Sequence, residues 1–373
     1  MTTTKFHDSE IYFCGFSDSG KSTLISKLIK KMGSDFNIGY LKHDAHKFSM
    51  DKEGKDTWKA TNAGAKRIAI TSKDKNAYII HDQFKDNLLI PSFSDCDMLF
   101  VEGFKFTTLP KILVLGEFET KTRILEKLHS KEVTGAIALV GIEETNTTNI
   151  NLPYFNRDDI KGIQSFILEF FHQKFKDIPI YGLILAGGKS SRMGEDKGSL
   201  DYHGMAQVDH VQKILRNFTK QCFVSCRKEQ EHLPHLKYHL QIHDRLLEMG
   251  PGGGIVSALM EHKKAAWLVL ACDLPFLDEA TIENIIAKRN PFKVATCYRS
   301  SKNKLPEPLC AIYEPRAKQN FFQFFAKGYT CPRKMLINSN VLNIDLLNES
   351  SLANANTPDD FKLAKEKLGE VVL

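Results

Sequence analysis

Short apolar runs alternate with amphipathic stretches along the whole chain, which is the pattern of strands and helices in turn. Ile11–Cys14 is apolar and meets a glycine, as a buried strand entering a tight turn does. Ser22–Lys31 follows with apolar residues at helical spacing. Further strands are predicted in this half at Ile38–Leu41, Arg67–Thr71, Met98–Val101, Ile112–Leu115 and Ala136–Val140.

A second apolar run, Ile180–Leu185, also leads directly into a glycine-rich loop. The strands expected after it are Phe223–Cys226, Tyr238–Ile242, Trp267–Ala271, Val294–Tyr298 and Leu309–Tyr313. This alternation predicts parallel sheets with helices on both faces. Because Gly15 and Gly187 begin different motifs, we expect a fusion of two doubly wound α/β domains, residues 1–177 and 178–373, with a terminal helix at Lys161–Phe175 and a linker at Lys176–Pro179.

Composition narrows the class of protein. The 373 residues are 42% hydrophobic and 26% charged, as in a soluble globular protein. A net charge of +6 suits polyphosphate ligands, but no Lys/Arg run with interleaved aromatics indicates nucleic acid. The eight cysteines are scattered without a CxxC, which favours reduced thiols in the cytoplasm. The polar start and the lack of a long apolar run predict neither a signal peptide nor a membrane span.

The first glycine loop is a phosphate-binding loop. The segment 15–22 matches GxxxxGK[ST] between a predicted strand and helix. Backbone N–H groups of such a loop wrap the β-phosphate, Lys21 neutralises phosphate oxygens, and Ser22 offers its hydroxyl to Mg²⁺. The nucleotide-binding residues predicted here are Gly15, Ser17, Asp18, Ser19, Gly20, Lys21, Ser22 and Thr23.

Acids and histidines that follow could complete this site. Asp97 and Glu102 flank an apolar Walker-B-type run, and a carboxylate at either end could reach the Mg²⁺ shell. Of the two, Glu102 is predicted as the metal ligand. His43 and His46 are spaced to bind metal, although such pairs more often face solvent.

The first half resembles the MobB family, the GTP-binding accessory proteins of molybdenum cofactor guanylation, over about residues 8–175. The likeness rests on the phosphate loop and on four later segments, which occur in the family's order: Lys42-His43, Asp51–Asp56, Ala63–Ala65 and Val101–Lys105. Ala45 and Lys47 interrupt the histidine cluster that family members carry. The resemblance implies a P-loop NTPase-like domain that binds GTP, with weak GTPase activity, and a homodimer formed through this domain.

The second glycine loop is more specific. Leu185–Lys197 reads LAGGxSxRMGxDK, in which two glycines let backbone N–H groups approach a base and phosphates without a Cβ. Arg192 and Lys197 lie on this loop and can reach a triphosphate from both sides. Both are predicted to be catalytic.

A strand-tip acid is expected to complete the second site. Val269–Ala271 is apolar and leads to Asp273, and the carboxyl end of a parallel strand is where a doubly wound sheet places its ligand chemistry. Asp273 is therefore predicted to bind Mg²⁺ and to be catalytic. Asp244 follows an earlier strand, and the glycines of 250–254 open a helix as a second anion-accepting loop or as a flexible turn.

This half resembles the MobA family, the molybdenum cofactor guanylyltransferases, over about residues 179–370. The resemblance implies a Rossmann-like nucleotidyltransferase domain that joins GMP from GTP to the terminal phosphate of molybdopterin. It implies guanine recognition by Leu185, Ala186, Gly187 and Gly188, and nucleotide contacts from Lys197 and Asp244. Asn354, Asn356 and Arg333 match the pterin side. The chain departs from the family at Ser225-Cys226-Arg227, where members can carry asparagines, so ribose contacts there are not assigned.

The expected partners are GTP, molybdopterin and the recipient molybdoenzyme apoprotein, with Mg²⁺ as cofactor and neither nucleic acid nor membrane. Three alternatives remain from the residues. A molybdopterin cytidylyltransferase would have a nearly identical fold and metal site. A sugar-phosphate nucleotidyltransferase shares the glycine loop. A non-catalytic GTP-dependent cofactor-delivery protein would carry a degenerate transferase domain, against which the intact Lys197 and Asp273 argue.

Overall fold

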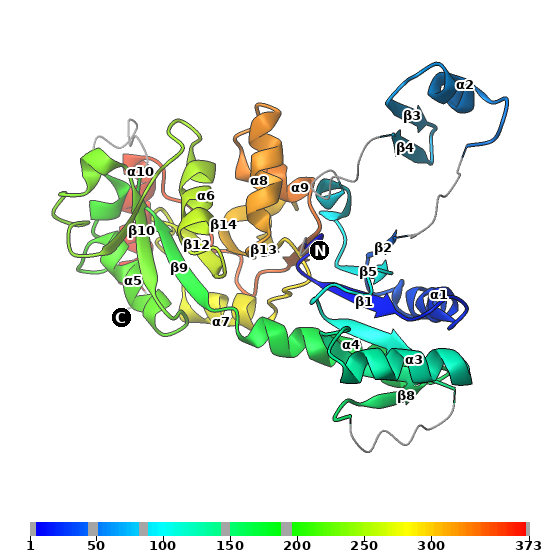
Figure 1. Cartoon of the computed structure of the whole chain (residues 1–373). Coiled ribbons are helices and arrows are strands. Elements are labelled where there is room, and N and C mark those ends of the chain that lie inside the picture. Colours follow the sequence, from blue (N-terminus) through cyan, green and yellow to red (C-terminus); the bar gives the residue numbers. More distant parts are fainter. Residues whose placement is uncertain (1–4, 44–50, 82–88, 143–149, 188–195, 371–373) are drawn as a thin grey trace. The chain divides into compact units, whose positions relative to one another are not determined.

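The computed structural model describes residues 5–43, 51–81, 89–142, 150–187 and 196–370. The chain divides into two compact units, residues 1–167 and 168–373. Within the described ranges each unit is built around its own large sheet (Figure 1). The prediction of two α/β domains is confirmed.

The sheet of the first unit is entirely parallel and runs in the order β2-β5-β1-β6-β7-β8. Its strands are β1 (Glu10–Cys14), β2 (Ile38–Lys42), β5 (Met98–Glu102), β6 (Lys111–Val114), β7 (Ala136–Gly141) and β8 (Tyr154–Asn156). Strands β1, β5 and β6 are buried along their whole length, as expected for the centre of a parallel sheet. Five of these six strands were predicted, and the short edge strand β8 was not.

Helices α1 (Lys21–Met32), α3 (Phe118–His129) and α4 (Ile160–Lys176), with the 3₁₀ turn η2 (Ile90–Phe93), accompany this sheet. Helix α1 buries Leu24 and Leu28 and contacts β1 and β5. Ile124 of α3 joins the apolar cluster that contains Tyr12 and Leu99. Apolar residues at helical spacing therefore fix each helix on the sheet.

A small antiparallel sheet lies outside the parallel one. It pairs β3 (Arg67–Thr71) with β4 (Asn76–Ile80), and α2 (Asp56–Asn62) contacts β3. The predicted strand at Arg67–Thr71 exists, but it does not join the parallel sheet. Only Ile68 of this strand is buried, whereas a central parallel strand needs two covered faces.

The sheet of the second unit has the order β11-β10-β9-β12-β14-β13-β15. Its strands are β9 (Ile180–Leu185), β10 (Cys222–Cys226), β11 (Leu240–His243), β12 (Ala266–Ala271), β13 (Ala295–Arg299), β14 (Pro306–Tyr313) and β15 (Val341–Ile344). The sheet is mixed, not wholly parallel as the alternation had suggested, because β14 pairs antiparallel with both β12 and β13. The segment 300–305 is too short for a crossover, so β13 and β14 form a hairpin.

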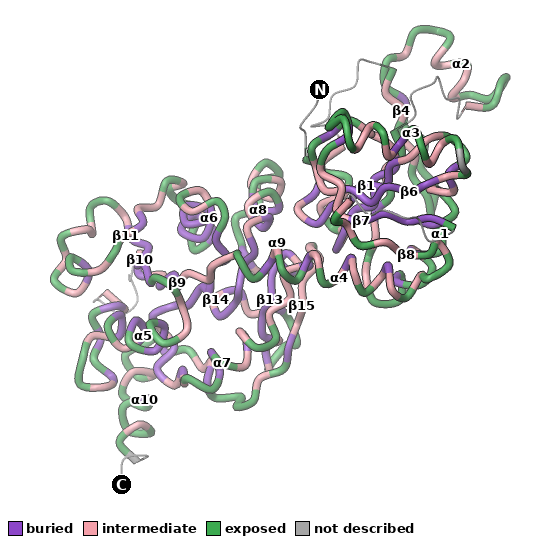
Figure 2. Tube along the Cα trace, turned by 60° about the horizontal axis from the view of Figure 1, so that its bottom comes forward, coloured by how far each residue is buried: buried purple, intermediate pink, exposed green. Residues whose placement is uncertain are grey.

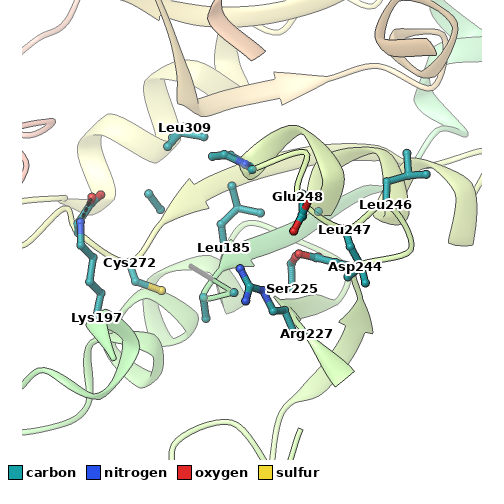
Figure 3. Close-up of a pocket in the computed structure, with 17 residues that line it drawn as sticks. Leu185, Lys197, Ser225, Arg227, Asp244, Leu246, Leu247, Glu248, Cys272 and Leu309 are labelled. Atoms are coloured by element: carbon teal, nitrogen blue, oxygen red, sulfur yellow. Dashed lines mark hydrogen bonds and ion pairs between the residues drawn. The ribbon is translucent and has the colours of Figure 1, made fainter. Parts of the chain in front are cut away.

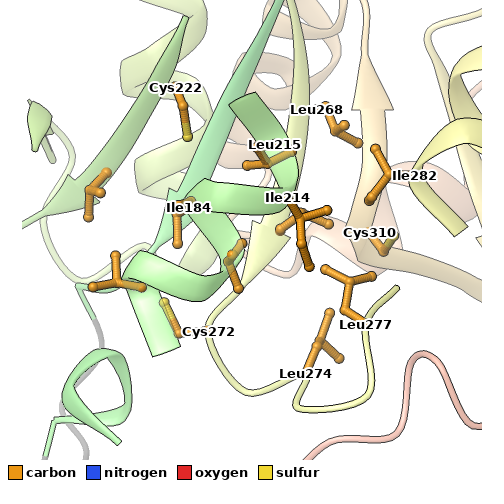
Figure 4. Close-up of a cluster of buried hydrophobic side chains, with 14 of the residues drawn as sticks. Ile184, Ile214, Leu215, Cys222, Leu268, Cys272, Leu274, Leu277, Ile282 and Cys310 are labelled. Atoms are coloured by element: carbon orange, nitrogen blue, oxygen red, sulfur yellow. The ribbon is translucent and has the colours of Figure 1, made fainter. Parts of the chain in front are cut away.

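Helices cover both faces of this sheet. Helices α5 (Gln207–Arg216) and α7 (Glu279–Ala287) pack on one face, and α6 (Pro251–Glu261), α8 (Ala317–Ala326) and α9 (Pro332–Ile337) pack on the other. Alternate residues of β12 divide between the two cores. Leu268 (Figure 4) and Leu270 face the α5 side, whereas Trp267 and Val269 face the α6 side. Figure 2 shows the buried strands between helices whose outer faces are exposed.

Helix α10 (Pro358–Glu370) ends the described chain, and η3 (Lys197–Ser199) and η4 (Lys228–Gln230) are single 3₁₀ turns. The division between the units falls within α4, between Ile167 and Leu168. The predicted domain boundary at 177/178 lies just beyond this helix and stays a prediction. No helix in the described part of the chain has the length and hydropathy to cross a bilayer.

Candidate functional site

In the second unit, two loops meet where the strand order reverses. Strand β9 is followed in sequence by β10 on one side, while β12 pairs with it on the other. The register aligns Leu185 with Ala271, so the loops after β9 and β12 leave the same edge of the sheet. Carboxyl edges at such a switch point are where open α/β sheets bind ligands.

A cavity of about 330 Å³ opens at this edge (Figure 3). It is bounded by the ends of β9, β10, β11 and β12 and by the start of α6. Of the predicted nucleotide residues it brings together Leu185, Ala186, Gly187, Lys197, Asp244 and Asp273. Gly188 and Arg192 lie outside the described residues.

Lys197 and Asp273 form the charged end of this cavity. Lys197 Nζ lies 2.9 Å from Asp273 Oδ2 and donates to Asn356 Oδ1 at 2.6 Å. Asp273 Oδ1 is buried, and among the described residues it has no hydrogen-bond partner. Mg²⁺ is commonly held by one or two carboxylates together with substrate phosphates. An unsatisfied carboxylate oxygen beside a cavity that suits a triphosphate fits that cation.

Asp244 lies at another part of the cavity and is held by Ser225. Ser225 Oγ donates to Asp244 Oδ1 at 2.6 Å. Burial raises the pKa of Asp244, and the Ser225 hydrogen bond and the charge of Arg227 partly oppose this effect. Ser225 and Arg227 both line the cavity, although the sequence interpretation treated them only as a departure from the family. Their position at the carboxyl end of β10, which neighbours β9, was the available signal.

The backbone of the glycine loop is partly committed to the sheet. Ala186 N–H donates to the carbonyl of Ser225 at 3.0 Å. A Cβ on Gly187 would lie 3.3 Å from Asp244 Oδ2 and from Cys226 Cα, so the glycine permits a close approach of two strand ends. Recognition of a base by this loop would therefore use groups other than the Ala186 N–H.

The glycines at 252–254 belong to the first turn of α6 and are buried, so they are not a flexible turn. A Cβ on Gly253 would lie 2.4 Å from the carbonyl oxygen of Leu246, and one on Gly254 would lie 2.4 Å from Ser225 Oγ. Close packing of the helix against the cavity wall thus requires glycine at these positions. Gly250 and Pro251, at the helix start, line the cavity.

The three residues predicted for the pterin fall into two places. Arg333 and Asn354 line a separate hollow of about 70 Å³ that also touches Asp273. Arg333 donates to Glu307 Oε2 at 2.8 Å and to the Pro306 carbonyl at 3.0 Å. Asn356 contacts Lys197 instead.

Thr357 caps the start of helix α10. Asp360 N–H donates to Thr357 Oγ1 at 3.2 Å, and the Asp360 carboxylate accepts the N–H groups of Asn356 and Thr357. These hydrogen bonds hold the pKa of Asp360 below its usual value. The cap fixes the backbone beside Asn356, so capping and a binding role for that residue are compatible.

The first unit has a larger cavity, about 900 Å³, around its phosphate loop. It is lined by Gly15, Ser17, Asp18, Gly20, Lys21, Ser22 and Thr23 of the predicted set, and by Glu102. Ser19 is buried, and its Oγ would lie 2.6 Å from a Cβ on Gly15. Gly20 has φ of 87°, which favours glycine.

Ser22 and Glu102 are brought into direct contact. Ser22 Oγ donates to Glu102 at 2.8 Å, and the Tyr40 hydroxyl donates to Glu102 Oε2 at 2.6 Å. The serine hydroxyl and the carboxylate are the oxygen ligands that Mg²⁺ takes in P-loop proteins. Asp97 cannot share this role, because it is buried at the opposite end of β5 and accepts the backbone N–H of Asn37 at 2.8 Å.

Lys21 points back onto its own loop. Its Nζ donates to the Phe16 carbonyl at 2.5 Å and to Ser19 Oγ at 3.4 Å, and burial lowers its pKa. His43 lines the cavity and stacks on Phe104 at 4.2 Å, while His46 lies outside the described residues. Across the described ranges, no group of three or more His, Cys, Asp or Glu side chains could hold a metal ion. Any cation here would depend on few protein ligands.

Both cavities open beside a glycine loop at the carboxyl edge of a sheet, and this arrangement defines a two-domain nucleotide-binding protein whose second unit has the nucleotidyltransferase architecture. Two families match the chain. Residues 182–336 match the MobA-like NTP transferase domain, and residues 11–140 match molybdopterin guanine dinucleotide synthesis protein B.

Individual proteins are similar to parts of this chain. A molybdenum cofactor guanylyltransferase of Pseudomonas paraeruginosa is 32% identical over 48% of this chain and 90% of its own length. A molybdenum cofactor biosynthesis bifunctional protein of Synechocystis is 36% identical over 49% of this chain, which spans about half (53%) of that relative. The crystal structure of Bacillus subtilis MobB is 28% identical over 43% of this chain and 96% of its own, with a TM-score of 0.36. The chain belongs to the molybdenum cofactor guanylyltransferase family and carries a MobB domain ahead of its transferase domain.

Proposed function

We propose that the chain transfers GMP from GTP to the terminal phosphate of molybdopterin, with Mg²⁺, and releases pyrophosphate. The carrying observation is the Lys197–Asp273 pair, 2.9 Å apart, at the edge of the cavity. The second oxygen of Asp273 is buried and accepts no hydrogen bond from the part of the chain that the structure describes. Membership of the guanylyltransferase family supports the choice of substrates. Mono- and divalent cations are attracted to such an oxygen, and Mg²⁺ suits a triphosphate best.

No side-chain nucleophile is needed, because the attacker is already a phosphate oxygen. A bond forms between that oxygen and the α-phosphorus of GTP, and the bond from the α-phosphorus to the bridging oxygen breaks, so that the electron pair leaves with pyrophosphate. Lys197 neutralises charge that accumulates on the phosphates, and Arg192 is proposed to do so from the same loop. Asp273 would hold Mg²⁺, which supplies further charge stabilisation when bound.

The first unit is proposed to bind GTP at the phosphate loop, with Ser22 and Glu102 holding Mg²⁺. The contact of 2.8 Å between these two side chains supports that assignment. Weak GTPase activity, a homodimer through this unit and docking of the recipient apoprotein belong to the same proposal. The cytoplasmic location expected from the sequence is also part of this proposal.

The test is pyrophosphate release by the full chain with molybdopterin as acceptor, measured with GTP, CTP and ATP, with and without chelation of Mg²⁺. Each hydrogen bond lost with the wrong base costs about 1–3 kcal/mol, so GTP should be used at least about tenfold better than CTP and ATP. Equal or better use of CTP would replace the guanylyl assignment by cytidylyl transfer. Full activity in excess chelator would remove Mg²⁺ from the proposal.

A further inference from the structure

The nucleotide cavity is lined by a positively charged side chain to which the proposed transfer chemistry gives no role. Arg227 follows β10 directly and lines the cavity together with Ser225 and Asp244. Figure 3 shows its guanidinium group turned into the cavity between Leu185 and Asp244. No carboxylate in the described ranges forms an ion pair with Arg227 (N···O within 4.0 Å), although Asp244 is close enough for the charge of Arg227 to lower its pKa.

The backbone at Arg227 is fixed by Gln230. Arg227 N–H donates to Gln230 Oε1 at 3.1 Å, and its carbonyl accepts the N–H of Gln230 at 2.9 Å. Gln230 Nε2 also reaches Asp196 Oδ2 at 3.2 Å, at the start of the Lys197 turn. The backbone that carries the Arg227 side chain is therefore held by hydrogen bonds within this turn.

The position of Arg227 favours the base over the phosphates. Lys197 and its ion-pair partner Asp273 mark the end of the cavity where the reacting phosphates are expected. Figure 3 shows Arg227 and Asp244 away from Lys197. Asp244 is pinned by Ser225 and lies against Gly187, where a Cβ would be 3.3 Å from its Oδ2. A carboxylate and a guanidinium thus face the same part of the cavity, beside the glycine loop.

Guanine matches this pair of charges. Its O6 and N7 are adjacent acceptors that an Arg fork contacts in a bidentate manner, and its N1–H and N2 amino groups are donors suited to a carboxylate. Adenine offers N7 but an amino donor in place of O6, and cytosine has no N7. We propose that Arg227 determines base specificity by donating to O6 and N7 of guanine, with Asp244 beside the N1–H edge. This inference rests on the proposed use of GTP by the second unit.

Binding is tested without the acceptor, so that it does not depend on transfer. The full chain carries Lys21→Ala to silence the phosphate loop, and its affinity for GTP, ATP and 7-deaza-GTP, which lacks N7, is measured by isothermal titration calorimetry. Arg227→Met and Arg227→Lys are compared with Lys228→Met. Lys228 is the adjacent residue, pairs with Glu231 and does not line the cavity, so it controls for the loss of one positive charge.

The parent chain should bind GTP about tenfold or more tightly than 7-deaza-GTP. Arg227→Met should bind GTP and 7-deaza-GTP with equal affinity. Arg227→Lys should still bind all three nucleotides but lose most of the preference for GTP over 7-deaza-GTP. Lys228→Met should show the same affinities as the parent. Equal weakening of all three nucleotides by Arg227→Met would assign Arg227 to the phosphates and overturn the inference, as would an unchanged ratio. If the ratio depends on Arg227 but no GMP reaches molybdopterin, the proposed function fails and this inference stands.

Discussion

Lys197 Nζ lies 2.9 Å from Asp273 Oδ2. The same ammonium group donates to Asn356, and the backbone carbonyl of Asp273 accepts the N–H of Ala355 at 3.0 Å. The loop after β9, the loop after β12 and the segment before α10 therefore converge on Lys197 and Asp273. This convergence places the nucleotide cavity next to the hollow lined by Asn354, so donor and acceptor phosphates could meet at Asp273.

We expect Asp273→Asn to lower pyrophosphate release on the order of a hundredfold or more, because the amide loses the charge that attracts Mg²⁺. The fold should persist, since Asp273 lies beside a cavity and is not packed in a core. Circular dichroism and kcat with GTP and molybdopterin measure the two effects. Asp345→Asn, which removes an exposed acid paired with Arg299, is the matched control. Activity close to wild type in a folded Asp273→Asn protein would refute the metal assignment.

Glu102→Gln should remove one of two GTP sites. Loss of the charge at Glu102 weakens the binding of Mg²⁺ at the phosphate loop, whereas the cavity of the second unit is unaffected. Titration calorimetry with GTP and Mg²⁺ should resolve two sites in the wild type and one in the variant, with transfer unchanged. Asp97→Asn should destabilise the protein but keep both sites, because Asp97 supports the backbone of Asn37 and does not reach the cavity. Retention of both sites by Glu102→Gln would contradict the assignment.

Gly254→Ala should destabilise the second unit by about 1–3 kcal/mol, as overpacking does. Its Cβ would lie 2.4 Å from Ser225 Oγ and 3.2 Å from Asp244 Oδ1, so the KM for GTP should rise as well. Gly369→Ala adds the same methyl group in α10, where nothing lies within 4 Å, and should be neutral or stabilise by a few tenths to about 1 kcal/mol. Thermal unfolding and kinetics check both variants; equal behaviour of the two would contradict the packing argument.

The stability gained by the Asp244→Asn substitution, relative to the wild type, should depend on pH. Burial raises the pKa of Asp244, so the folded protein holds this proton more tightly than the unfolded chain, whose pKa is about 4. The stabilisation from the protonated acid is full below that value and is lost as the pH rises through the folded pKa. The amide, which can still accept from Ser225, should therefore raise the Tm at pH 7, and the gain should disappear near pH 3. A constant difference between these pH values would be inconsistent with this account.

We expect the end of α4 to stabilise the transferase unit, so that truncation beyond this helix lowers its stability. Phe171 and Phe175 contact the ring of Phe292, with centroids 5.8 and 4.9 Å away, and Phe171 is fully buried. A protein of residues 178–373 loses both rings and exposes Phe292, so it should unfold at a lower temperature than one of residues 168–373. Both should release pyrophosphate when folded. Equal Tm values would show that these rings contribute nothing to the unit.

The elements that the sequence predicted are those whose signal is local. Ile180–Leu185 and Met98–Val101 are apolar runs ending at glycine or an acid, and the two glycine loops carry their own chemistry in contiguous residues. The strand at Arg67–Thr71 was predicted correctly, yet its partner was not, because pairing depends on which faces become covered. The antiparallel direction of β14 likewise follows from the short turn at residues 300–305, because the pattern of strands alone does not specify strand direction.

The sequence by itself determined two α/β nucleotide domains, the phosphate loop, the transferase loop and Asp273 as the strand-tip acid. Only the tertiary structure decided that Arg333 pairs with Glu307, and that Ser225 holds Asp244 while Arg227 enters the cavity. The reason is that a motif fixes the conformation of neighbouring residues, whereas partners distant in the chain are chosen by strand order and register. At the carboxyl edge of a sheet, those two quantities set which side chains can touch.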